Sequence, residues 1–235
     1  MSGPALAQTD KEVQALDSYL ETLGLTDLRI LNLERILDRQ PGNDAAAQAL
    51  ADLYAGRLLV VTDSEESASL DHQIDDLLRK HPSANTPSLQ VMRLQGDFNR
   101  AETLASSWID QPSDDEARQA ALALLTRITP PLDGLQAKLF QALEAERTAV
   151  NDLPDGPTRS RREQDLDRLA DVAGRALYFD AWANQYLAMT DEEGASVRYE
   201  RARTGFLKLL GVESEADVSA ELLATSGMAR AALGL

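Results

Sequence analysis

Cysteine is absent from the 235-residue chain, and histidine occurs only as His72 and His81. Without cysteine there is no disulfide, no thiolate nucleophile and no thiolate-bound metal. The two histidines are about two and a half helical turns apart, so they do not share a helix face. Neither belongs to the Glu-x-x-His pair of di-metal bundles or to the His-Glu-x-x-His motif of zinc proteases.

A glycine-rich phosphate loop and a serine in a nucleophile-elbow context are also missing from the sequence. The acidic pairs 75–76 and 114–115 lack a third carboxylate one helical turn further on. We therefore expect no metal, no cofactor and no enzymatic activity. A site assembled from carboxylates of distant helices is the catalytic arrangement that the sequence leaves open.

Basic residues are scarce, because 23 Lys and Arg stand against 39 Asp and Glu and give a formal net charge of −16. A chain this acidic is repelled by phosphate backbones, so nucleic acid is not an expected partner. No apolar run reaches the roughly 18 residues of a membrane helix, the longest being 58–61 and 120–125. We therefore expect a soluble protein without membrane insertion.

Aromatic residues make up 5% of the chain, while alanine and leucine are abundant, which favours helices over sheets. Apolar residues recur three and four positions apart between proline- and glycine-containing breaks. These patterns predict an all-α fold of about 10–12 helices. The predicted helices cover residues 10–24, 26–40, 43–59, 67–80, 87–95, 101–110, 113–128, 134–151, 158–189, 195–210 and 214–226.

Residues 179–211 have the pattern of a complete helix-turn-helix unit. Each half has its apolar residues on one face, at spacings that suit a helix. These residues are Phe179, Trp182, Ala183 and Tyr186 in the first half, and Ala195, Tyr199, Ala202 and Phe206 in the second. Residues 190–193, Thr-Asp-Glu-Glu, predict a capping box that starts the second helix, and residues 113–116 predict another.

This unit resembles the tetratricopeptide repeat, a helical hairpin of about 34 residues. The residues that match the family's order of bulky, small and aromatic side chains are Phe179, Trp182, Ala183, Tyr186, Ala195, Tyr199 and Ala202. The same order recurs at Ala47, Leu50, Ala51 and Tyr54, and residues 96–101 resemble the family's turn and second-helix start. Thr190 and Leu207 depart from its glycine and proline. The resemblance implies an α-solenoid of antiparallel helix pairs.

The strongest break in the chain is at residues 151–157, where Asn, Asp, Pro and Gly cluster. We expect a disordered tail at 1–9, tetratricopeptide-like repeats at 10–153, and a second part at 154–235 that continues the same solenoid. The second part contains a long helix, the 179–211 unit and the end helices. Residues 214–235 are rich in Ala and Leu, which indicates either self-association through this end or a further repeat that covers it.

The compartment depends on residues 5–7, Ala-Leu-Ala, which have the small-x-small form of a signal-peptidase site without its hydrophobic region. They are either the remnant of an export signal or an alanine-rich start. The first reading places the protein in the periplasm or outside the cell, and the second in the cytoplasm.

The resemblance further implies that exposed positions of the first helices line a groove for a partner peptide. The positions carried over are Gln48, Asp52, Gln90, Arg93, Arg118, Asp180 and Asn184. Asn184 is expected to bond the peptide backbone. The first hypothesis is therefore a non-enzymatic scaffold or adaptor for another protein. A self-assembling module that stacks through residues 214–235 and a helical carrier of a small apolar ligand are the alternatives.

Overall fold

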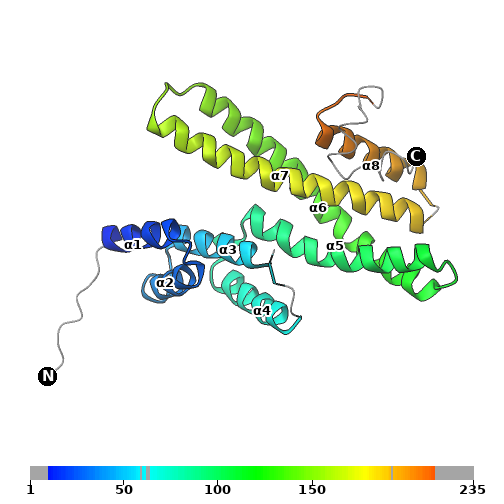
Figure 1. The fold of residues 1–235 in the computed structure, drawn as a ribbon, viewed down its shortest axis with the longest axis horizontal. Coiled ribbons are helices and arrows are strands. Elements are labelled where there is room, and N and C mark those ends of the chain that lie inside the picture. The colour runs from blue at the N-terminus through cyan, green and yellow to red at the C-terminus, as the bar shows by residue number, and fades with distance from the viewer. Residues whose placement is uncertain (1–9, 59, 62–63, 192, 215–235) are drawn as a thin grey trace. The chain divides into compact units, whose positions relative to one another are not determined.

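A computed structural model describes residues 10–58, 60–61, 64–191 and 193–214 (Figure 1). Its elements are α1 (Asp10–Thr22), α2 (Thr26–Arg39), α3 (Asp44–Leu58), α4 (Ser64–Lys80), the 3-10 helix η1 (Pro82–Ala84), α5 (Pro87–Asp110), α6 (Asp115–Asn151), α7 (Pro157–Thr190) and α8 (Ala195–Leu210). All regular elements in these ranges are helical, which confirms the all-α prediction for them. No helix among them is long and apolar enough to cross a membrane. The predicted tail at 1–9 and residues 215–235 lie outside the described ranges.

The chain forms two compact units, residues 1–90 and 91–235. The division falls in the first turn of α5. The predicted division at residue 154 instead falls inside the second unit, in the loop that joins α6 to α7.

The first unit contains two helix pairs, α1 with α2 and α3 with α4, and α4 begins at Ser64 rather than at the predicted residue 67. Gly24, with φ of +66°, ends the turn after α1, and the Leu25 N–H donates to the Leu20 carbonyl at 3.0 Å. The Arg29 guanidinium on α2 donates two hydrogen bonds to the Asp17 carboxylate on α1, at 3.2 and 3.0 Å. The buried core of this unit includes Leu20, Ile30, Leu33, Leu37, Ala47, Leu50, Ala51, Tyr54, Leu70, Ile74 and Leu77.

In the second unit, α5 runs through Gly96 without a break, so the predicted turn at 96–100 is wrong. A glycine inside a helix costs about 1 kcal/mol relative to alanine, which is too little to end a helix that gains from burial. Phe98, two residues on, is 2% exposed and contacts α7. Tyr186 on α7 donates a hydrogen bond to Glu102 on α5 at 3.0 Å, and burial together with that carboxylate raises the pKa of Tyr186 to about 12.

Helix α6 continues through Pro130 and Pro131, so the predicted helix end at these prolines is also wrong. Both prolines are exposed, so the backbone carbonyls that they leave unpaired can bond to water. Ile128, Leu132 and Leu135 remain buried on either side of them. Burying each such side chain contributes about 1.5–3 kcal/mol, which offsets the roughly 3 kcal/mol that a helical proline costs.

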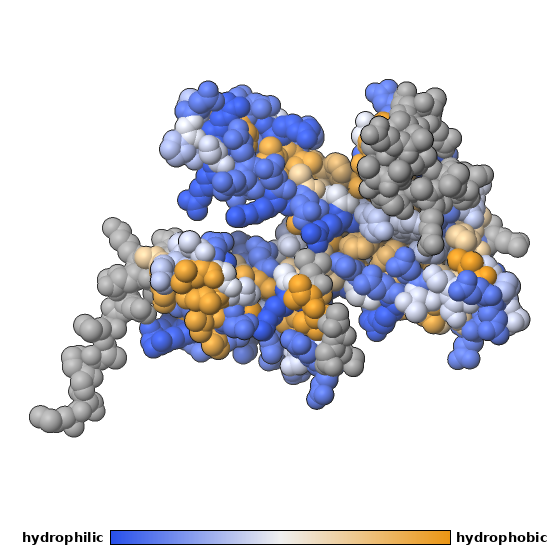
Figure 2. Space-filling model, in the orientation of Figure 1, coloured by the Kyte–Doolittle hydropathy of each residue, from blue (hydrophilic) through white to orange (hydrophobic). Residues whose placement is uncertain are grey.

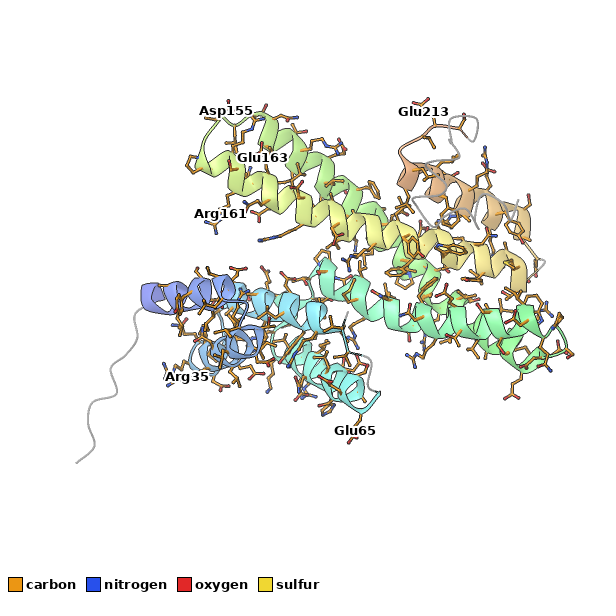
Figure 3. The ribbon with its side chains drawn as sticks, in the orientation of Figure 1. Arg35, Glu65, Asp155, Arg161, Glu163 and Glu213 are labelled. Atoms are coloured by element: carbon orange, nitrogen blue, oxygen red, sulfur yellow. The ribbon has the colours of Figure 1, made fainter. Side chains whose placement is uncertain are left out.

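Helix α7 has 34 residues and is the long helix that the sequence predicts. It lies alongside α6 in an antiparallel hairpin, whose loop end is shown in Figure 3 by Asp155, Arg161 and Glu163. Arg159 pairs with Asp155 at 2.8 Å and with Glu163 at 2.9 Å, which compensates for its unfavourable place at a helix start. Arg162 pairs across the hairpin with Glu146 at 3.4 Å.

The helix-turn-helix unit at 179–211 is confirmed by the end of α7 and by α8, but the predicted capping box is not formed. The Thr190 hydroxyl donates back into its own helix, to the Tyr186 carbonyl at 2.8 Å. Asp191 instead accepts a hydrogen bond from the Glu193 N–H at 3.1 Å. Gly194, with φ of +75°, precedes the first residue of α8.

Helix lengths vary widely along the chain. Helices α1 to α4 have 13, 14, 15 and 17 residues, whereas α5, α6 and α7 have 24, 37 and 34. Two predicted pairs, at 87–110 and 113–151, are the single helices α5 and α6. These unequal lengths differ from the even pairs of a consensus solenoid.

Helix α8 approaches α7 closely at Gly205, because a Cβ atom there would lie 2.8 Å from the Cβ of Ala181. The same atom would lie 3.6 Å from a methyl group of Leu177. We therefore expect Gly205→Ala to lower the free energy of unfolding of the second unit by about 1–3 kcal/mol, because the helices must move apart. Urea unfolding followed by circular dichroism measures this change.

Gly174 in α7 provides the matched control, because a Cβ atom there meets open space. Gly174→Ala should leave the stability unchanged or raise it by up to about 1 kcal/mol, since alanine is the better helix former. A Gly205→Ala protein as stable as the wild type would show that the close approach of α8 to α7 is not present in solution.

Candidate functional site

The predicted groove residues of the first unit are Gln48, Asp52 and Gln90. Gln48 and Asp52 are exposed on α3. Asp52 accepts a hydrogen bond from the Thr86 hydroxyl at 3.0 Å, and the Gln90 amide donates to the Asn85 carbonyl at 3.0 Å. Asp52 and Gln90 therefore stabilise the turn that leads from η1 into α5, and none of the three residues lines the hollow described below.

Arg93 and Arg118 have different surroundings in the second unit. Arg93 is exposed on α5. The Arg118 guanidinium donates from Nε to the Thr190 carbonyl at 2.9 Å and lies 5.7 Å from the centre of the Trp108 ring. Arg118 thus joins the start of α6 to the end of α7, and the stacking on Trp108 strengthens this contact.

Asp180 and Asn184 are buried, with 6% and 1% exposure, which contradicts the expectation that they are exposed groove positions. The Asn184 amide donates to the Asp180 carbonyl at 2.8 Å and to its carboxylate at 3.2 Å. The expectation is wrong because nearly every side chain from 179 to 190 is covered, so α7 has no solvent face there. Burial is the main cause that raises the pKa of Asp180 to about 6.

A hollow of about 670 Å³ lies among α2, α3 and α4 in the first unit, and we call it the acidic groove. Its lining residues are Glu34, Leu37, Asp38, Pro41, Leu50, Tyr54, Gln73, Asp76, Leu77, Lys80 and His81. A volume of this size is within the usual range of binding sites, about 300–1,000 Å³. The groove is therefore the candidate functional site of the first unit.

The floor of the acidic groove is apolar and fixed by packing. Leu37 from α2, Leu50 and Tyr54 from α3, and Leu77 from α4 form it, and all four are core residues. The Tyr54 hydroxyl donates to the Glu34 carboxylate at 2.9 Å. Burial, followed by this hydrogen bond, raises the pKa of Tyr54 well above its ordinary value. The floor therefore exists before any partner binds.

Carboxylates dominate the rim of the groove. Glu34 and Asp38 come from α2 and Asp76 from α4, whereas Lys80 and His81 are the basic side chains that line it. Asp76 also pairs with Arg79, and Asp38 is exposed. An apolar floor between acidic edges can bind apolar side chains that are flanked by basic ones.

A second exposed surface lies at the N-terminal helix pair. Figure 2 shows hydrophobic residues gathered over α1 and α2. The exposed apolar side chains of these helices and their turn are Tyr19, Leu23, Leu25, Leu28 and Leu31. Leu28 and Leu31 are three residues apart, so they lie on one outward face of α2.

The acidic groove was not predicted from the sequence, although the residues of one of its edges are close together in the chain. Glu34 and Asp38 are four residues apart, so they lie on the same face of α2, and Leu37 is beside them. The opposite rim comes from α4, where Asp76 is 38 residues further along the chain than Asp38. The groove forms because α2 and α4 both pack against α3, and this packing is a tertiary contact that the local sequence does not show.

Within the described ranges, no group of three or more His, Asp or Glu side chains is placed to hold a metal ion. His81 lines the groove, while His72 does not. No protein-family model matches this chain, and neither a curated protein nor a solved structure matches it.

Proposed function

We propose that this chain is a non-enzymatic scaffold or adaptor built from tetratricopeptide-like helix pairs, and that its acidic groove binds a basic, leucine-bearing segment of another protein. The observation that carries the proposal is an apolar floor with carboxylates on both edges.

The floor supports a helical or extended segment as the ligand, because apolar anchors spaced along one face of a peptide fit a row of apolar positions. Leu37, Leu50 and Leu77 supply apolar positions in the groove from three different helices. A few buried anchors usually carry most of the binding free energy, so a short segment is sufficient.

The charge supports a basic ligand. Glu34, Asp38 and Asp76 give the rim more negative than positive charge, and the whole chain has a formal net charge of −16. Complementary charge accelerates encounter and selects against acidic segments. Salt should weaken the interaction, since rim charges are exposed and screened.

The two alternative functions receive less support. Self-assembly through residues 214–235 depends on a segment that lies outside the described ranges except for Ser214. A carrier of an apolar ligand needs an apolar cavity, whereas the acidic groove and the hollow beside α8 are lined mainly by charged and polar side chains.

The test uses a fluorescein-labelled helical peptide with leucines at positions i, i+4 and i+7 and lysines elsewhere on its surface. Binding is measured by fluorescence anisotropy against the full chain. We expect saturable binding, and we expect a twin peptide with glutamates in place of the lysines to bind at least about tenfold more weakly. Equal affinity for the two peptides would contradict the basic preference.

Two charge reversals separate the groove from the general acidity of the chain. Asp38→Lys reverses a rim charge, and Asp71→Lys makes the same change on an exposed part of α4 that does not line the groove. Asp38→Lys should weaken binding of the lysine peptide about tenfold or more, and Asp71→Lys by no more than about twofold. Equal losses in the two variants would overturn the proposed site.

A further inference from the structure

A second hollow, of about 490 Å³, lies among α6, α7 and α8 in the second unit, and we call it the α8 pocket. Its lining residues are Asp133, Gln136, Leu177, Asp180, Ser196, Val197, Glu200, Arg201, Thr204, Gly205 and Lys208. Gly205 is part of it because the lack of a side chain there lets α8 approach α7. The pocket thus depends on the same close approach that holds these helices together.

Asp180 is the residue that distinguishes this pocket from an ordinary surface hollow. It is 94% buried and still lines the pocket. One carboxylate oxygen accepts a hydrogen bond from the neutral Asn184 amide. In the described part of the chain, no lysine or arginine forms a salt bridge with Asp180, since Arg201 pairs with Asp133 at 2.6 Å.

A buried carboxylate without a cationic partner lowers the free energy of unfolding, because no ion pair compensates for the loss of its hydration. The charged groups around Asp180 act in opposite directions: Arg201 from α8 favours its ionised form and Asp133 from α6 opposes it. Their mutual salt bridge leaves little net charge from the pair. A buried acid of this kind that lies in a hollow is a candidate functional residue. A ligand with a positive charge would compensate for its desolvation.

The rest of the pocket suits an organic cation with an aliphatic part. Leu177 and Val197 provide apolar surface, and the Ser196 and Thr204 hydroxyls and the Gln136 amide provide hydrogen-bonding groups. Lys208 and Glu200 lie on α8 at exposed positions, and Glu200 pairs with Arg203 at 2.9 Å. An anion is disfavoured, because Arg201 is already neutralised and Asp180 would repel it.

We propose that the α8 pocket binds a small organic cation, an alkylammonium or alkylguanidinium, whose charged group pairs with Asp180 and whose alkyl chain contacts Leu177 and Val197. This site is independent of the acidic groove, which belongs to the first unit. A ligand of this type needs no movement of the helices, because the pocket is open in the structure.

The experiment titrates the full chain with n-butylammonium and with n-butylguanidinium, and follows the backbone amide resonances of Thr204 and Gly205 by NMR. Sodium chloride and magnesium chloride at equal ionic strength, and neutral 1-butanol, are the comparison titrants. The proposal expects saturable shifts with at least one of the two organic cations and no saturable shifts with the others. Shifts that are equal for butylammonium and sodium would overturn it.

Asp180→Asn should weaken binding at least about tenfold, because it removes the charge and keeps the shape. Asp167→Asn is the matched control: it makes the same change on an exposed position of α7 and should alter the affinity by less than about twofold. Val197→Lys places a cation at a position that is 67% exposed, so it should block binding while the helical circular dichroism is retained. Unchanged binding in Asp180→Asn or Val197→Lys, or an equal loss in Asp167→Asn, would refute the site.

The affinity should also depend on pH, because protonated Asp180 cannot pair with a cation. Its pKa is raised to about 6, so we expect the affinity to be about tenfold lower at pH 5 than at pH 8. The other charged groups that line the pocket are Asp133 from α6 and Glu200, Arg201 and Lys208 from α8. An affinity that is constant from pH 8 to 5 would contradict the assigned contact.

Discussion

Replacing Phe98 with alanine is expected to lower the free energy of unfolding of the second unit by about 3–5 kcal/mol. Phe98 is 2% exposed on α5, and its ring centre lies 5.2 Å from that of Phe179 and 6.4 Å from that of Tyr186, both on α7. The substitution removes these aromatic contacts and leaves a cavity between the two helices. Because domains are commonly stable by about 5–15 kcal/mol, the loss is a large fraction of the total.

Urea unfolding followed by tryptophan fluorescence measures this effect, because Trp182 stacks on Tyr186 with ring centres 5.5 Å apart. The control is Ile109→Ala on the same helix, where the side chain is 41% exposed. It should cost less than about 1 kcal/mol, since little buried area is lost. A Phe98→Ala loss as small as that of the control would show that α5 does not pack on α7 through this ring.

The second unit is expected to become more stable as the pH falls from 7.5 to 5.5, by about 1 kcal/mol. The pKa of Asp180 is raised from 3.8 to about 6 in the folded state, mainly by burial. A raised pKa means that the folded state binds the proton more tightly than the unfolded state. The stabilisation is therefore present at low pH and is lost as the pH rises through about 6. Both histidines of the chain, His72 and His81, are in the first unit and do not obscure this change.

Asp180→Asn should abolish this pH dependence and raise the free energy of unfolding at pH 7.5 by up to about 3 kcal/mol, since asparagine resembles the protonated acid. Asp167→Asn, at an exposed position, should retain the pH dependence of the wild type and leave its stability nearly unchanged. Urea titrations at the two pH values measure both variants. A destabilised Asp180→Asn protein at pH 7.5 would mean that Arg201 stabilises the carboxylate more than burial destabilises it.

If the Asp180 carboxylate lowers the stability of the folded protein, we expect it to have a function other than stabilising the fold. If Asp180→Asn gains stability and loses the alkylammonium site, the buried charge is a stability cost that binding offsets. If it gains stability and binding is unchanged, the proposed pocket is wrong while the account of Asp180 as a buried acid still holds. The two experiments thus test different statements about the same side chain.

The ends of helices were predictable from the sequence where the breaking signal was strong, but the capping residues were not. The turns at 111–114 and 152–156, which combine proline or glycine with aspartate, separate α5 from α6 and α6 from α7. Asp114 rather than Ser113 provides the cap, accepting a hydrogen bond from the Ala117 N–H at 2.9 Å. Nearby residues indicate where a helix starts. Which of several neighbouring polar side chains caps it depends on their geometry in the folded chain.

Breakers that lie within an apolar-periodic run could not be judged from sequence in the same way. Gly96 and the pair Pro130 and Pro131 suggested turns, yet α5 and α6 pass through them. A single glycine costs about 1 kcal/mol and a helical proline about 3 kcal/mol, and burial of flanking apolar side chains against another helix can exceed either. Whether such a helix continues therefore depends on the partner helix.

The sequence by itself determined the helical class, the two-helix unit at 179–211 and the acidic character of the surface, because periodicity, capping residues and charge are local properties of the chain. The tertiary structure decided the lengths of α5 and α6, the burial of Asp180 and Asn184, and the assembly of the acidic groove from α2, α3 and α4. Side chains project from a helix in all directions around its axis, and the helices that pack against it determine which of them are exposed to solvent.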